Sequence, residues 1–525
     1  MSKFNKLRTK VAALSPIVTG RWPSGRTHEG APGWVRDAKG ELFLLAVSNM
    51  GGEDTFYEAA SERDTRYAQL VHEVAVADPL WMAAFTAWLR SGANMRSASL
   101  VAALEGAKAM VAANLAGSRQ MIAGVLQRAD EPGEALAYWL SRYGRSIAKP
   151  VKRGIADAVA RLYTEYGLLK YDTAAKGFRF ADVIDLVHPV PAAAWQSVLF
   201  KVALERRHAR DDLSIGALPM LVANAELRAS ATGDPAVLLD PDRLKAAGMT
   251  WEDVLSLAGS TVDKRLLWEA LIPSMGYMAL LRNLRNFDEA GVSDAVASAI
   301  AARLSDPDSV ARSRQFPFRF LAAYEQAPSL RWGHALDRAL QASLANLPAL
   351  PGRTLILVDT SASMTHRAFS ERSRMTPAKA AAVFGVALAA RGEKVDLRGF
   401  ADGVFHHRVP NGASVIKEVD RFVARTGEVG HGTQIAASLR ASYSGHDRVV
   451  IISDMQTMDG AYGKGVSEVV PARVPIYGFN LGGYKHTAYA AGSANRHEFG
   501  GLTDATFRMI PLLEAGKNAN WPWIT

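Results

Sequence analysis

Cysteine is absent from the 525-residue sequence. Without thiols the chain has no disulfides, no thiolate zinc site and no cysteine nucleophile, and this composition suits a reducing, cytoplasmic environment. No apolar run reaches the roughly 18 residues that a membrane span requires, so we expect no membrane association. The basic N-terminal segment contains only a short apolar run, interrupted by Ser15 and Pro16, which predicts no signal peptide.

Familiar catalytic motifs are also missing, since the sequence holds no P-loop, HExxH or GxSxG pattern. Hydrophobic residues make up 49% and charged residues 22%, which is typical of a folded protein rather than a disordered one. Lys and Arg number 61 against 52 Asp and Glu, a net charge of +9. This excess is compatible with a polyanionic partner without requiring one, so local clusters of charge are more informative than the total.

Amphipathic helices are predicted from about residue 53 to residue 347. Leu336, Leu340, Leu344 and Leu347 recur at the spacing of one helix face, and short Pro- and Gly-containing breakers separate many similar segments. So much helix exceeds what one compact bundle accommodates. The sequence therefore predicts an α-solenoid of stacked helical pairs with degenerate, HEAT-like repeats.

A second pattern begins after the Pro-rich segment 348–352. Short apolar, β-branched runs now alternate with helices, which predicts a doubly wound α/β domain with a buried parallel sheet. The expected strands are 354–358, 395–400, 448–453 and 475–480, and a helix is expected at 378–390. We therefore divide the chain into a helical region with an N-terminal arm, residues 1–350, and an α/β domain, residues 351–525.

Candidate metal ligands follow two of these strands. The first strand ends in a D-x-S-x-S motif formed by Asp359, Ser361 and Ser363, another strand ends at Asp454, and a glycine-rich loop between them supplies Thr433. Carboxyl ends of parallel strands share one edge of a sheet, so these side chains should converge. Two carboxylates with hydroxyl oxygens suit a hard divalent cation such as Mg²⁺. Alternatively, D-x-S-x-S is only a turn and helix cap; the ordered threonine and second aspartate favour a metal site.

A basic segment lies between Glu134 and Asp157, where no acidic residue occurs. Its cations are Arg142, Arg145, Lys149, Lys152 and Arg153. In one continuous helix the last four would share a face, although Pro150 fits best in the first turn of a helix. Such a face beside Tyr and Trp residues suits phosphates and stacked bases. The alternative is a solvated surface that binds nothing.

Two looser basic sets follow farther along the chain. One consists of Lys170, Lys176, Arg179 and His188. The other surrounds the sequence Gln-Phe-Pro-Phe at 315–318 and contains Arg312, Arg314 and Arg319. Neither set identifies a ligand by itself.

The order of these features resembles the Ro autoantigen family, whose members combine a helical TROVE module with a von Willebrand factor A domain. Residues 51–57, GGEDTFY, are similar to the glycine-and-aromatic start of the module, and residues 143–157 resemble its G-R-x-x-x-K…A-I-A-D helix. Residues 280–284, LLRNL, and 317–319, PFR, match two further family segments. The A-domain resemblance rests on the D-x-S-x-S motif with the later Thr and Asp, the family's metal-ion-dependent adhesion site (MIDAS). Bacterial Ro-type proteins are the most similar branch.

This resemblance implies a closed ring of helical repeats that binds RNA. Small non-coding Y RNAs would bind its outer surface, and single-stranded 3′ ends of misfolded or structured RNAs would enter a central cavity. The family's Y RNA contacts map to Lys170 and His188, with Lys176 in place of an arginine, a change that weakens a bidentate contact. Bacterial members are also expected to act with an exoribonuclease such as polynucleotide phosphorylase in RNA quality control, maturation and stress survival.

We therefore predict a non-catalytic RNA-binding protein in which Arg142, Arg145, Lys149, Lys152, Arg153, Lys170, Lys176, Arg179 and His188 contact RNA. A metal-dependent protein-adhesion scaffold, in which the MIDAS captures an acidic side chain of a partner, is the alternative. A metal-dependent nuclease is less consistent with the sequence, because the metal ligands lack the clustered carboxylates of a two-metal site.

Overall fold

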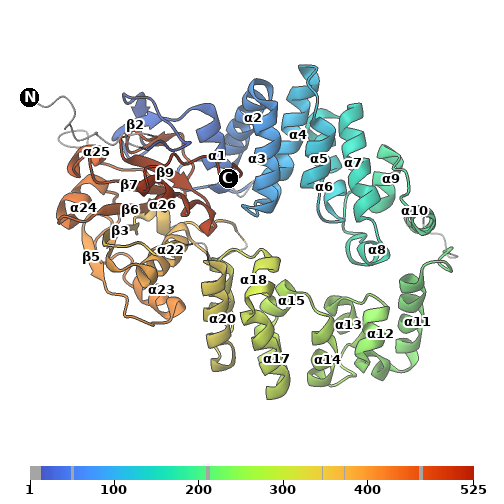
Figure 1. The fold of residues 1–525 in the computed structure, drawn as a ribbon. Helices are drawn as coiled ribbons and strands as arrows, with labels where there is room; N and C mark the ends of the chain where they lie inside the picture. Colours follow the sequence, from blue (N-terminus) through green and yellow to red (C-terminus); the bar gives the residue numbers. More distant parts are fainter. Residues whose placement is uncertain are drawn as a thin grey trace, which may run out of the picture.

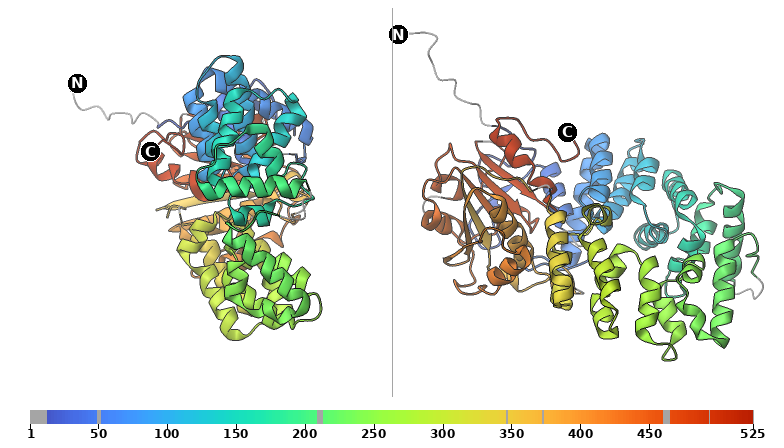
Figure 2. Two further views of the ribbon diagram at one scale, coloured as in Figure 1. Left: turned by 90° about the vertical axis from the view of Figure 1, so that its right-hand side faces the viewer. Right: turned by 60° about the horizontal axis from the view of Figure 1, so that its bottom comes forward.

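The computed structural model describes residues 13–48, 52–208, 213–345, 347–371, 373–459, 465–492 and 494–524. Figure 1 shows helices following one another around an arc that starts beside an α/β domain and returns to it. The views in Figure 2 show the same arc with the α/β domain at one end. Within the described ranges no helix is both long and apolar enough to cross a bilayer.

The first half of the arc is built from helices that pack in sequence order. Its helices are α1 (Ala38–Ser48), α2 (Ala60–Ala77), α3 (Pro79–Ser91), α4 (Arg96–Ala112), α5 (Ser118–Val125), α6 (Glu131–Tyr143), α7 (Lys149–Leu162), α8 (Glu165–Tyr171), α9 (Phe180–Val187) and α10 (Ala194–Arg207). Helix α2 packs on α4, α4 on α5, α5 on α7 and α7 on α9. Local sequence sets the boundaries: Asp78, for example, caps α3 by accepting a hydrogen bond from the Trp81 amide at 3.0 Å, ahead of Pro79 at the first helical position.

The second half continues with shorter helices. They are α11 (Pro219–Gly233), η1 (Pro235–Leu239), α12 (Pro241–Ala246), α13 (Trp251–Ala258), α14 (Lys264–Leu271), η2 (Ile272–Ser274), α15 (Tyr277–Arg282), α16 (Leu284–Ala290), α17 (Asp294–Ser305), α18 (Pro307–Ser313), α19 (Phe318–Gln326) and α20 (Leu330–Ser343). Leu336, Leu340, Leu344 and Leu347 are all buried, but α20 ends at Ser343, so only Leu336 and Leu340 lie on the predicted helix face.

The α/β domain contains a six-stranded sheet in the order β5-β4-β3-β6-β7-β9. Its strands are β3 (Arg353–Asp359), β4 (Lys394–Phe400), β5 (Val404–His407), β6 (Arg448–Ser453), β7 (Ile476–Asn480) and β9 (Arg496–Gly500). All neighbours are parallel except β4 and β5. The helices are α21 (Ala362–Thr365), α22 (Pro377–Arg391), α23 (Val415–Val423), α24 (Ile435–Ser442), α25 (Val466–Val469), η3 (Asp504–Thr506) and α26 (Met509–Glu514). Strand order reverses between β3 and β6, which makes this edge the expected ligand site.

Both faces of the sheet are buried, and alternate residues of each strand enter different cores. On β3, Ile356 and Val358 join the core that contains α22, whereas Leu355 and Leu357 join the core that contains α24 and α25. The continuous apolar pattern of the strand therefore reflects burial on two faces.

The N-terminal segment belongs spatially with the α/β domain, although it precedes the helices in sequence. Strand β2 (Pro32–Val35) pairs with β1 (Gly25–Arg26) on one side and with β8 (His486–Thr487) on the other. The fully buried Arg36 guanidinium forms an ion pair with Glu498 of β9 at 2.6 Å. Residues 13–37, which the division at residue 350 assigns to the helical region, thus pack against the sheet domain, and α1 connects them to the helical arc.

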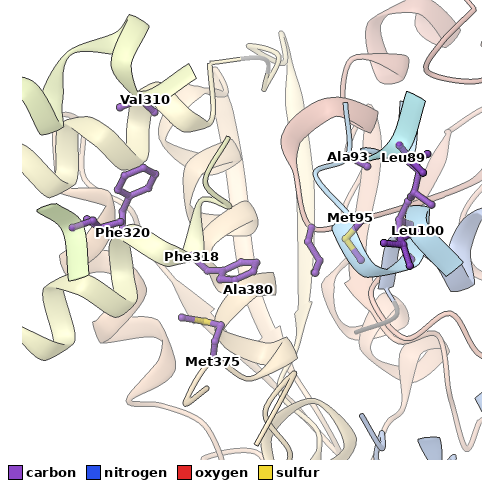
Figure 3. Packing of buried hydrophobic residues seen from close by; sticks show 14 of the residues in the cluster. Leu89, Ala93, Met95, Leu100, Val310, Phe318, Phe320, Met375 and Ala380 are labelled. Atoms are coloured by element: carbon purple, nitrogen blue, oxygen red, sulfur yellow. The ribbon is translucent and has the colours of Figure 1, made fainter. Parts of the chain in front are cut away.

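The other end of the arc also contacts the α/β domain, so the arc forms a closed ring. Asp337 of α20 accepts a hydrogen bond from the Ser414 hydroxyl at 2.8 Å, and Glu325 of α19 pairs with Lys379 of α22 at 2.6 Å. Figure 3 shows Phe318 at the start of α19 lying beside Met375 and Ala380 of the α/β domain.

The predicted fold class is confirmed: a helical-repeat region is followed by a doubly wound α/β domain. The four predicted strands correspond to β3, β4, β6 and β7, and the predicted helix 378–390 to α22. One local prediction is wrong. Arg145 does not share a helix with Lys149, because α6 ends at Tyr143, Gly144 adopts φ +71°, and α7 begins at Lys149. Pro150 sits in the first turn of α7, where its missing amide hydrogen costs no hydrogen bond.

Candidate nucleic-acid interface and metal centre

A basic groove crosses the helical region at α5, α7 and α9. Its volume is about 540 Å³. Lys149, Lys152 and Arg153 enter it from the first turns of α7, and His188 enters from the C-terminal end of α9. Lys149 and His188, 39 positions apart in the sequence, meet here because α7 packs between α5 and α9. The structure therefore brings four of the predicted RNA-binding residues together; we call this set the basic groove.

The charge of the basic groove is almost entirely positive. Asp157 is the one carboxylate among its described lining residues, and Arg119 binds it through two hydrogen bonds of 2.6 and 2.8 Å. These hydrogen bonds lower the pKa of Asp157 and neutralise its charge within the groove. The Lys149 and Arg153 side chains are exposed, and that of Lys152 is half-buried. Phosphates can therefore approach all three cations with little rearrangement.

A second, larger cavity of about 740 Å³ lies between the two halves of the arc. Its cationic lining residues are Arg128, Lys170, Arg282, Arg303 and Arg312, and its aromatic ones are Tyr166, Tyr171, Trp251 and Tyr277. The single carboxylate among the lining residues is that of Glu252. Cations beside aromatic rings in a confined space suit a single strand with stacked bases. We call this the central cavity.

Contacts across the arc hold the two halves close together at the central cavity. Arg314 donates a hydrogen bond to the Gln127 side chain at 3.0 Å, and Glu165 of α8 accepts one from the Leu221 amide of α11 at 3.0 Å. Of the basic set around residues 315–318, Arg312 lines the cavity, Arg314 makes this link, and Arg319 is exposed and lines neither the cavity nor the basic groove. The central cavity is therefore bounded by polar links between the two halves.

The three residues that the family resemblance assigns to Y RNA do not meet in one place. Lys170 lines the central cavity, with its Nζ 3.3 Å from the Tyr166 hydroxyl. Lys176 lies at a separate cavity of about 220 Å³ beside Tyr163 and Phe178. His188 lies in the basic groove. A single RNA that contacts all three has to extend across several helices.

Two of the predicted RNA-binding arginines form ion pairs within the protein. Arg179 is largely buried and pairs with the buried Asp172 at 2.7 Å. Arg142 pairs with Glu105, whose side chain is fully buried, at 2.8 Å. Arg145 is exposed in the loop before α7 and is not among the lining residues of the basic groove. Sequence alone did not reveal these ion pairs, because Asp172 and Glu105 lie outside the acid-free segment.

Glu105 organises a polar cluster beneath α6. His72, Tyr138 and Tyr143 contact its carboxylate in addition to Arg142. Burial raises the pKa of Glu105, but these hydrogen bonds and the guanidinium charge outweigh burial and lower the pKa to about 2. The aromatic residues that flank the basic segment in sequence are thus part of the packing of α6.

The predicted metal ligands converge at the edge between β3 and β6, and all five are buried: Asp359, Ser361, Ser363, Thr433 and Asp454. Asp359 accepts hydrogen bonds from the Ser361 amide at 2.8 Å and from the Ser453 hydroxyl at 2.6 Å. The hydroxyl oxygens of Ser361 and Ser363 are 3.2 Å apart. We call this cluster the metal edge.

The chemistry of the metal edge fits a hard divalent cation. Oδ2 of Asp454 is buried and has no hydrogen-bond partner in the structure, which leaves an oxygen ligand unsatisfied. Burial raises the pKa of Asp359, and burial together with the charge of Asp359 raises the pKa of Asp454. Two neighbouring carboxylates repel each other when both are ionised. A cation bound between them compensates the two negative charges and stabilises the ionised forms. Among the described residues no cluster of three or more His, Asp and Glu side chains suits a metal, so a cation at the metal edge would depend on hydroxyl oxygens as well as on the two carboxylates.

Residues from the N-terminal segment also lie near the metal edge, and no sequence pattern identified them. The turn between β1 and β2 carries His28 and Glu29, and Tyr57 stacks on His28 with ring centroids 4.9 Å apart. Tyr484 packs edge-on against Tyr57 at 5.3 Å. The sequence GGEDTFY at 51–57 is predicted only as a family resemblance, and its first residue, Gly51, lies outside the described residues. Its last residue, Tyr57, lies beside the metal edge.

Comparisons with known proteins identify part of the helical region. Residues 242–331 match the family model of the TROVE domain. Over 83 residues the chain is 43% identical to telomerase protein component 1 of Mus musculus and 42% identical to that of Rattus norvegicus. The matched segment is 15% of this chain and only 3% of either relative. The predicted resemblance to proteins with a TROVE module is confirmed.

The whole fold is similar to that of a solved Ro protein. The crystal structure of the Deinococcus radiodurans Ro (RSR) protein aligns with 91% of this chain and 100% of that chain, with a TM-score of 0.58 and 18% sequence identity. The TROVE match includes the LLRNL string, whose Arg282 and Asn283 line the central cavity.

Proposed function

We propose that this protein is a non-catalytic RNA-binding protein of a ribonucleoprotein. The observation that carries the proposal is the basic groove, in which the exposed Lys149 and Arg153 and the half-buried Lys152 have no competing free carboxylate among the described lining residues. Cations spaced along one groove bind the phosphates of an RNA duplex with little sequence preference. Small structured RNAs of the Y RNA type are the expected ligands of this groove.

The central cavity supports a second mode of binding. Its cations and aromatic rings suit a single-stranded 3′ end of a misfolded or structured RNA, held by charge and stacking. In this arrangement the groove binds the folded part of an RNA and the cavity receives its tail. A partner exoribonuclease, such as polynucleotide phosphorylase, would then act on the bound RNA in quality control or stress survival in the cytoplasm.

The decisive experiment measures the binding of two RNAs by fluorescence anisotropy: a blunt duplex and the same duplex with a single-stranded 3′ tail. The groove variant combines Lys149→Glu, Lys152→Glu and Arg153→Glu, and the cavity variant combines Lys170→Glu, Arg303→Glu and Arg312→Glu. We expect the groove variant to lose binding to both the blunt and the tailed duplex. The cavity variant should lose only the additional affinity that the tail provides.

A matched control reverses Lys245, Lys264 and Arg265, which are exposed on α12 and α14 and line neither site. This variant has the same change in net charge and should retain binding within about threefold, because long-range electrostatics are screened at physiological salt. Equal losses in all three variants would show that only net charge matters and would refute both sites.

The metal edge supports a second candidate function, metal-dependent capture of a protein. The unsatisfied Oδ2 of Asp454 favours it, since a cation held there by Asp359, Asp454 and the hydroxyls supplies Lewis-acid binding of a carboxylate. Asp359→Ala should abolish binding of Mg²⁺ and of any such partner without affecting RNA. Loss of RNA binding in Asp359→Ala would instead show that the two functions depend on one site.

A further inference from the structure

A polar pocket lies at the end of the sheet opposite the metal edge. Arg353 and Lys394 are the first residues of the parallel strands β3 and β4 and lie side by side in register, whereas Asp359 ends β3 at the metal edge. A cavity of about 320 Å³ opens there. Its polar lining residues are Arg353, Lys394, Asp396, Arg398, His406 and His446. We call this cavity the amino-end pocket.

The strand residues that line the amino-end pocket share one face of the sheet. Lys394, Asp396 and Arg398 alternate along β4, and His406 of β5 lies opposite Arg398 in the antiparallel pair. On the neighbouring strand β3, residues of the same face are buried in the core that contains α24 and α25. The pocket is therefore the polar margin of a face whose centre is covered by helices.

His446 is buried at this pocket, yet one of its ring nitrogens has no hydrogen-bond partner. Its side chain is 1% exposed. The Ser444 amide donates a hydrogen bond to Nδ1 at 3.3 Å, so Nδ1 is an acceptor and Nε2 of the neutral ring carries the hydrogen. Burial and the charge of Arg353 lower the pKa of His446, which favours the neutral ring.

Nε2 of His446 points toward Asp396 but does not bind it. The distance from Nε2 to Oδ2 of Asp396 is 3.7 Å, beyond a hydrogen bond, and no other described group accepts from Nε2. Buried donors in native structures are almost always satisfied. A buried N–H donor at the amino-end pocket therefore lacks an acceptor that a ligand could supply.

The carboxylate of Asp396 is already compensated within the protein. Arg398 donates two hydrogen bonds to it, at 3.1 and 2.8 Å, and Nε2 of His406 lies 3.3 Å from Oδ1. Burial raises the pKa of Asp396, but the hydrogen bonds and charge of Arg398 outweigh burial and lower it. Asp396 therefore holds the Arg398 guanidinium in place and adds little free negative charge to the pocket.

The remaining cations at the pocket are available to a ligand. The Arg353 guanidinium donates a hydrogen bond to the Ser444 carbonyl at 3.0 Å, which fixes it close to His446. Lys394 is exposed and forms no ion pair with any of the described carboxylates. With Arg398, the pocket has three cations against one compensated carboxylate.

We propose that the amino-end pocket binds a phosphate group. Its oxygens would accept a hydrogen bond from Nε2 of His446, and Arg353 and Lys394 would compensate its charge. Several cations with a fixed N–H donor favour a phosphate, which carries more charge and more acceptor oxygens than a carboxylate. The phosphate can belong to an RNA chain or to a small phosphorylated molecule, because the recognising chemistry is the same. The pocket is separate from the basic groove, the central cavity and the metal edge, so the proposal goes beyond the function proposed above.

The experiment uses inorganic phosphate as the probe and the full-length protein with the groove variant, so that the basic groove does not compete. Calorimetry measures the affinity. NMR of ¹⁵N-histidine-labelled protein follows the Nε2–H resonance of His446, which is assigned by its loss in His446→Phe. We expect Lys394→Gln and His446→Phe each to weaken phosphate binding about tenfold, the effect of losing one hydrogen bond to a charged group.

Two observations separate ligand contact from a structural role. Phosphate should shift the Nε2–H resonance while His446 is present, which a histidine that only supports the fold would not show. Lys417→Gln removes an exposed ammonium group from α23 of the same domain and should bind phosphate as its parent does, since Lys417 does not line the pocket. Lys394→Gln changes an exposed side chain, so it keeps the test valid if His446→Phe does not fold.

The tailed duplex RNA, titrated with an unaltered basic groove, identifies the source of the phosphate. Lower RNA affinity in Lys394→Gln than in Lys417→Gln would assign the pocket to an RNA chain. Unchanged RNA affinity with weakened binding of inorganic phosphate would assign it to a small phosphorylated molecule. Equal affinities of Lys394→Gln and Lys417→Gln for both probes, with no phosphate-dependent shift of the His446 resonance, would overturn the proposal and leave the basic groove and central cavity unaffected.

Discussion

The basic groove and the metal edge handle charge in opposite ways. In the groove the Lys149 and Arg153 side chains are exposed, so their charges are accessible to a ligand and contribute little to folding. At the metal edge Asp359 and Asp454 are buried, with exposed fractions of 0% and 3%, so their charges oppose folding until a cation or proton compensates them. We therefore expect substitutions in the basic groove to change ligand binding alone. Substitutions of buried charges in the α/β domain should change the free energy of unfolding as well.

The largest effect should come from the buried ion pair that fixes the N-terminal segment to the sheet. Glu498→Gln leaves the Arg36 guanidinium, whose side chain is fully buried, without its counter-charge. We expect the free energy of unfolding to fall by about 3–5 kcal/mol, as for other broken buried pairs. Urea unfolding followed by circular dichroism measures this loss.

An exposed pair in the helical arc provides the matched control for Glu498→Gln. Arg285 and Glu289 are 3.3 Å apart on α16, and both side chains are more than 60% exposed. Glu289→Gln should cost no more than about 0.5 kcal/mol. Similar losses in the two variants would contradict the distinction between buried and exposed charge.

The next largest effect concerns the basic groove. Charge reversal of Lys149, Lys152 and Arg153 should weaken duplex RNA binding by about 100-fold or more at low salt, because three phosphate contacts become repulsive. The slope of log K against log salt should fall by roughly 2–3, near 0.7–0.9 for each contact. The melting temperature should change by less than about 2 °C, because two of the three side chains are exposed and the third is half-buried, and substitutions at such surface positions rarely affect stability. A large fall in melting temperature would show that these cations are structural.

The two sites were also predictable from sequence to different degrees. The five predicted metal ligands lie near one edge of the sheet, because four of them end β3 or belong to the segments that follow β3 and β6, and the α/β fold fixes the order of these strands. Their role as metal ligands stays a prediction. The nine predicted RNA-binding residues separated into several environments, because helical spacing places residues on a face only while the helix continues. Gly144 ended that helix, and the distant acids Glu105 and Asp172 paired with Arg142 and Arg179.

Long-range pairing explains what sequence reasoning missed. The strands β1 and β2 and the docking of their turn on the α/β domain depend on contacts such as the hydrogen bond from Thr27 to Thr457, which joins residues 430 positions apart. The antiparallel strand β5 and the edge strand β9 complete the sheet, although neither has the long apolar run that marks β3 and β6. Local patterns therefore identified the core of each region but not the segments that connect them.

A smaller effect concerns the pH dependence of the melting temperature, which should be altered by a substitution at the metal edge but not by substitutions in the basic groove. The pKa of Asp454 is raised in the folded protein, so its carboxylate is easier to ionise in the unfolded chain. Without metal, this group stabilises the fold at low pH, and that contribution is lost as the pH rises above the unfolded value of 3.8. Asp454→Asn should therefore raise the melting temperature of the metal-free protein at pH 8 and have little effect at pH 4.

At pH 8, Mg²⁺ should make the melting temperature of the wild type higher than that of Asp454→Asn, because the cation should stabilise the wild type and have no effect on the variant. Differential scanning calorimetry with EDTA or Mg²⁺ checks both expectations. The groove variant serves as the control, since its melting temperature should show the wild-type response to pH and Mg²⁺. An Asp454→Asn protein that is less stable than the wild type at pH 8 in EDTA would contradict the raised pKa.

The smallest expected effect is the change in RNA affinity caused by Arg142→Gln. It tests whether a cation that is close in sequence to the groove residues also contributes to RNA binding. Arg142 lies seven residues before Lys149, yet it pairs with Glu105 at 2.8 Å and does not line the basic groove. Arg142→Gln should therefore change RNA affinity by less than about threefold, whereas Lys149→Gln should reduce it more and lower the salt slope by about one phosphate contact. Anisotropy titrations at three salt concentrations compare the two single-charge removals directly. Equal losses of affinity and slope would place Arg142 on the RNA path and extend the interface from α7 onto α6.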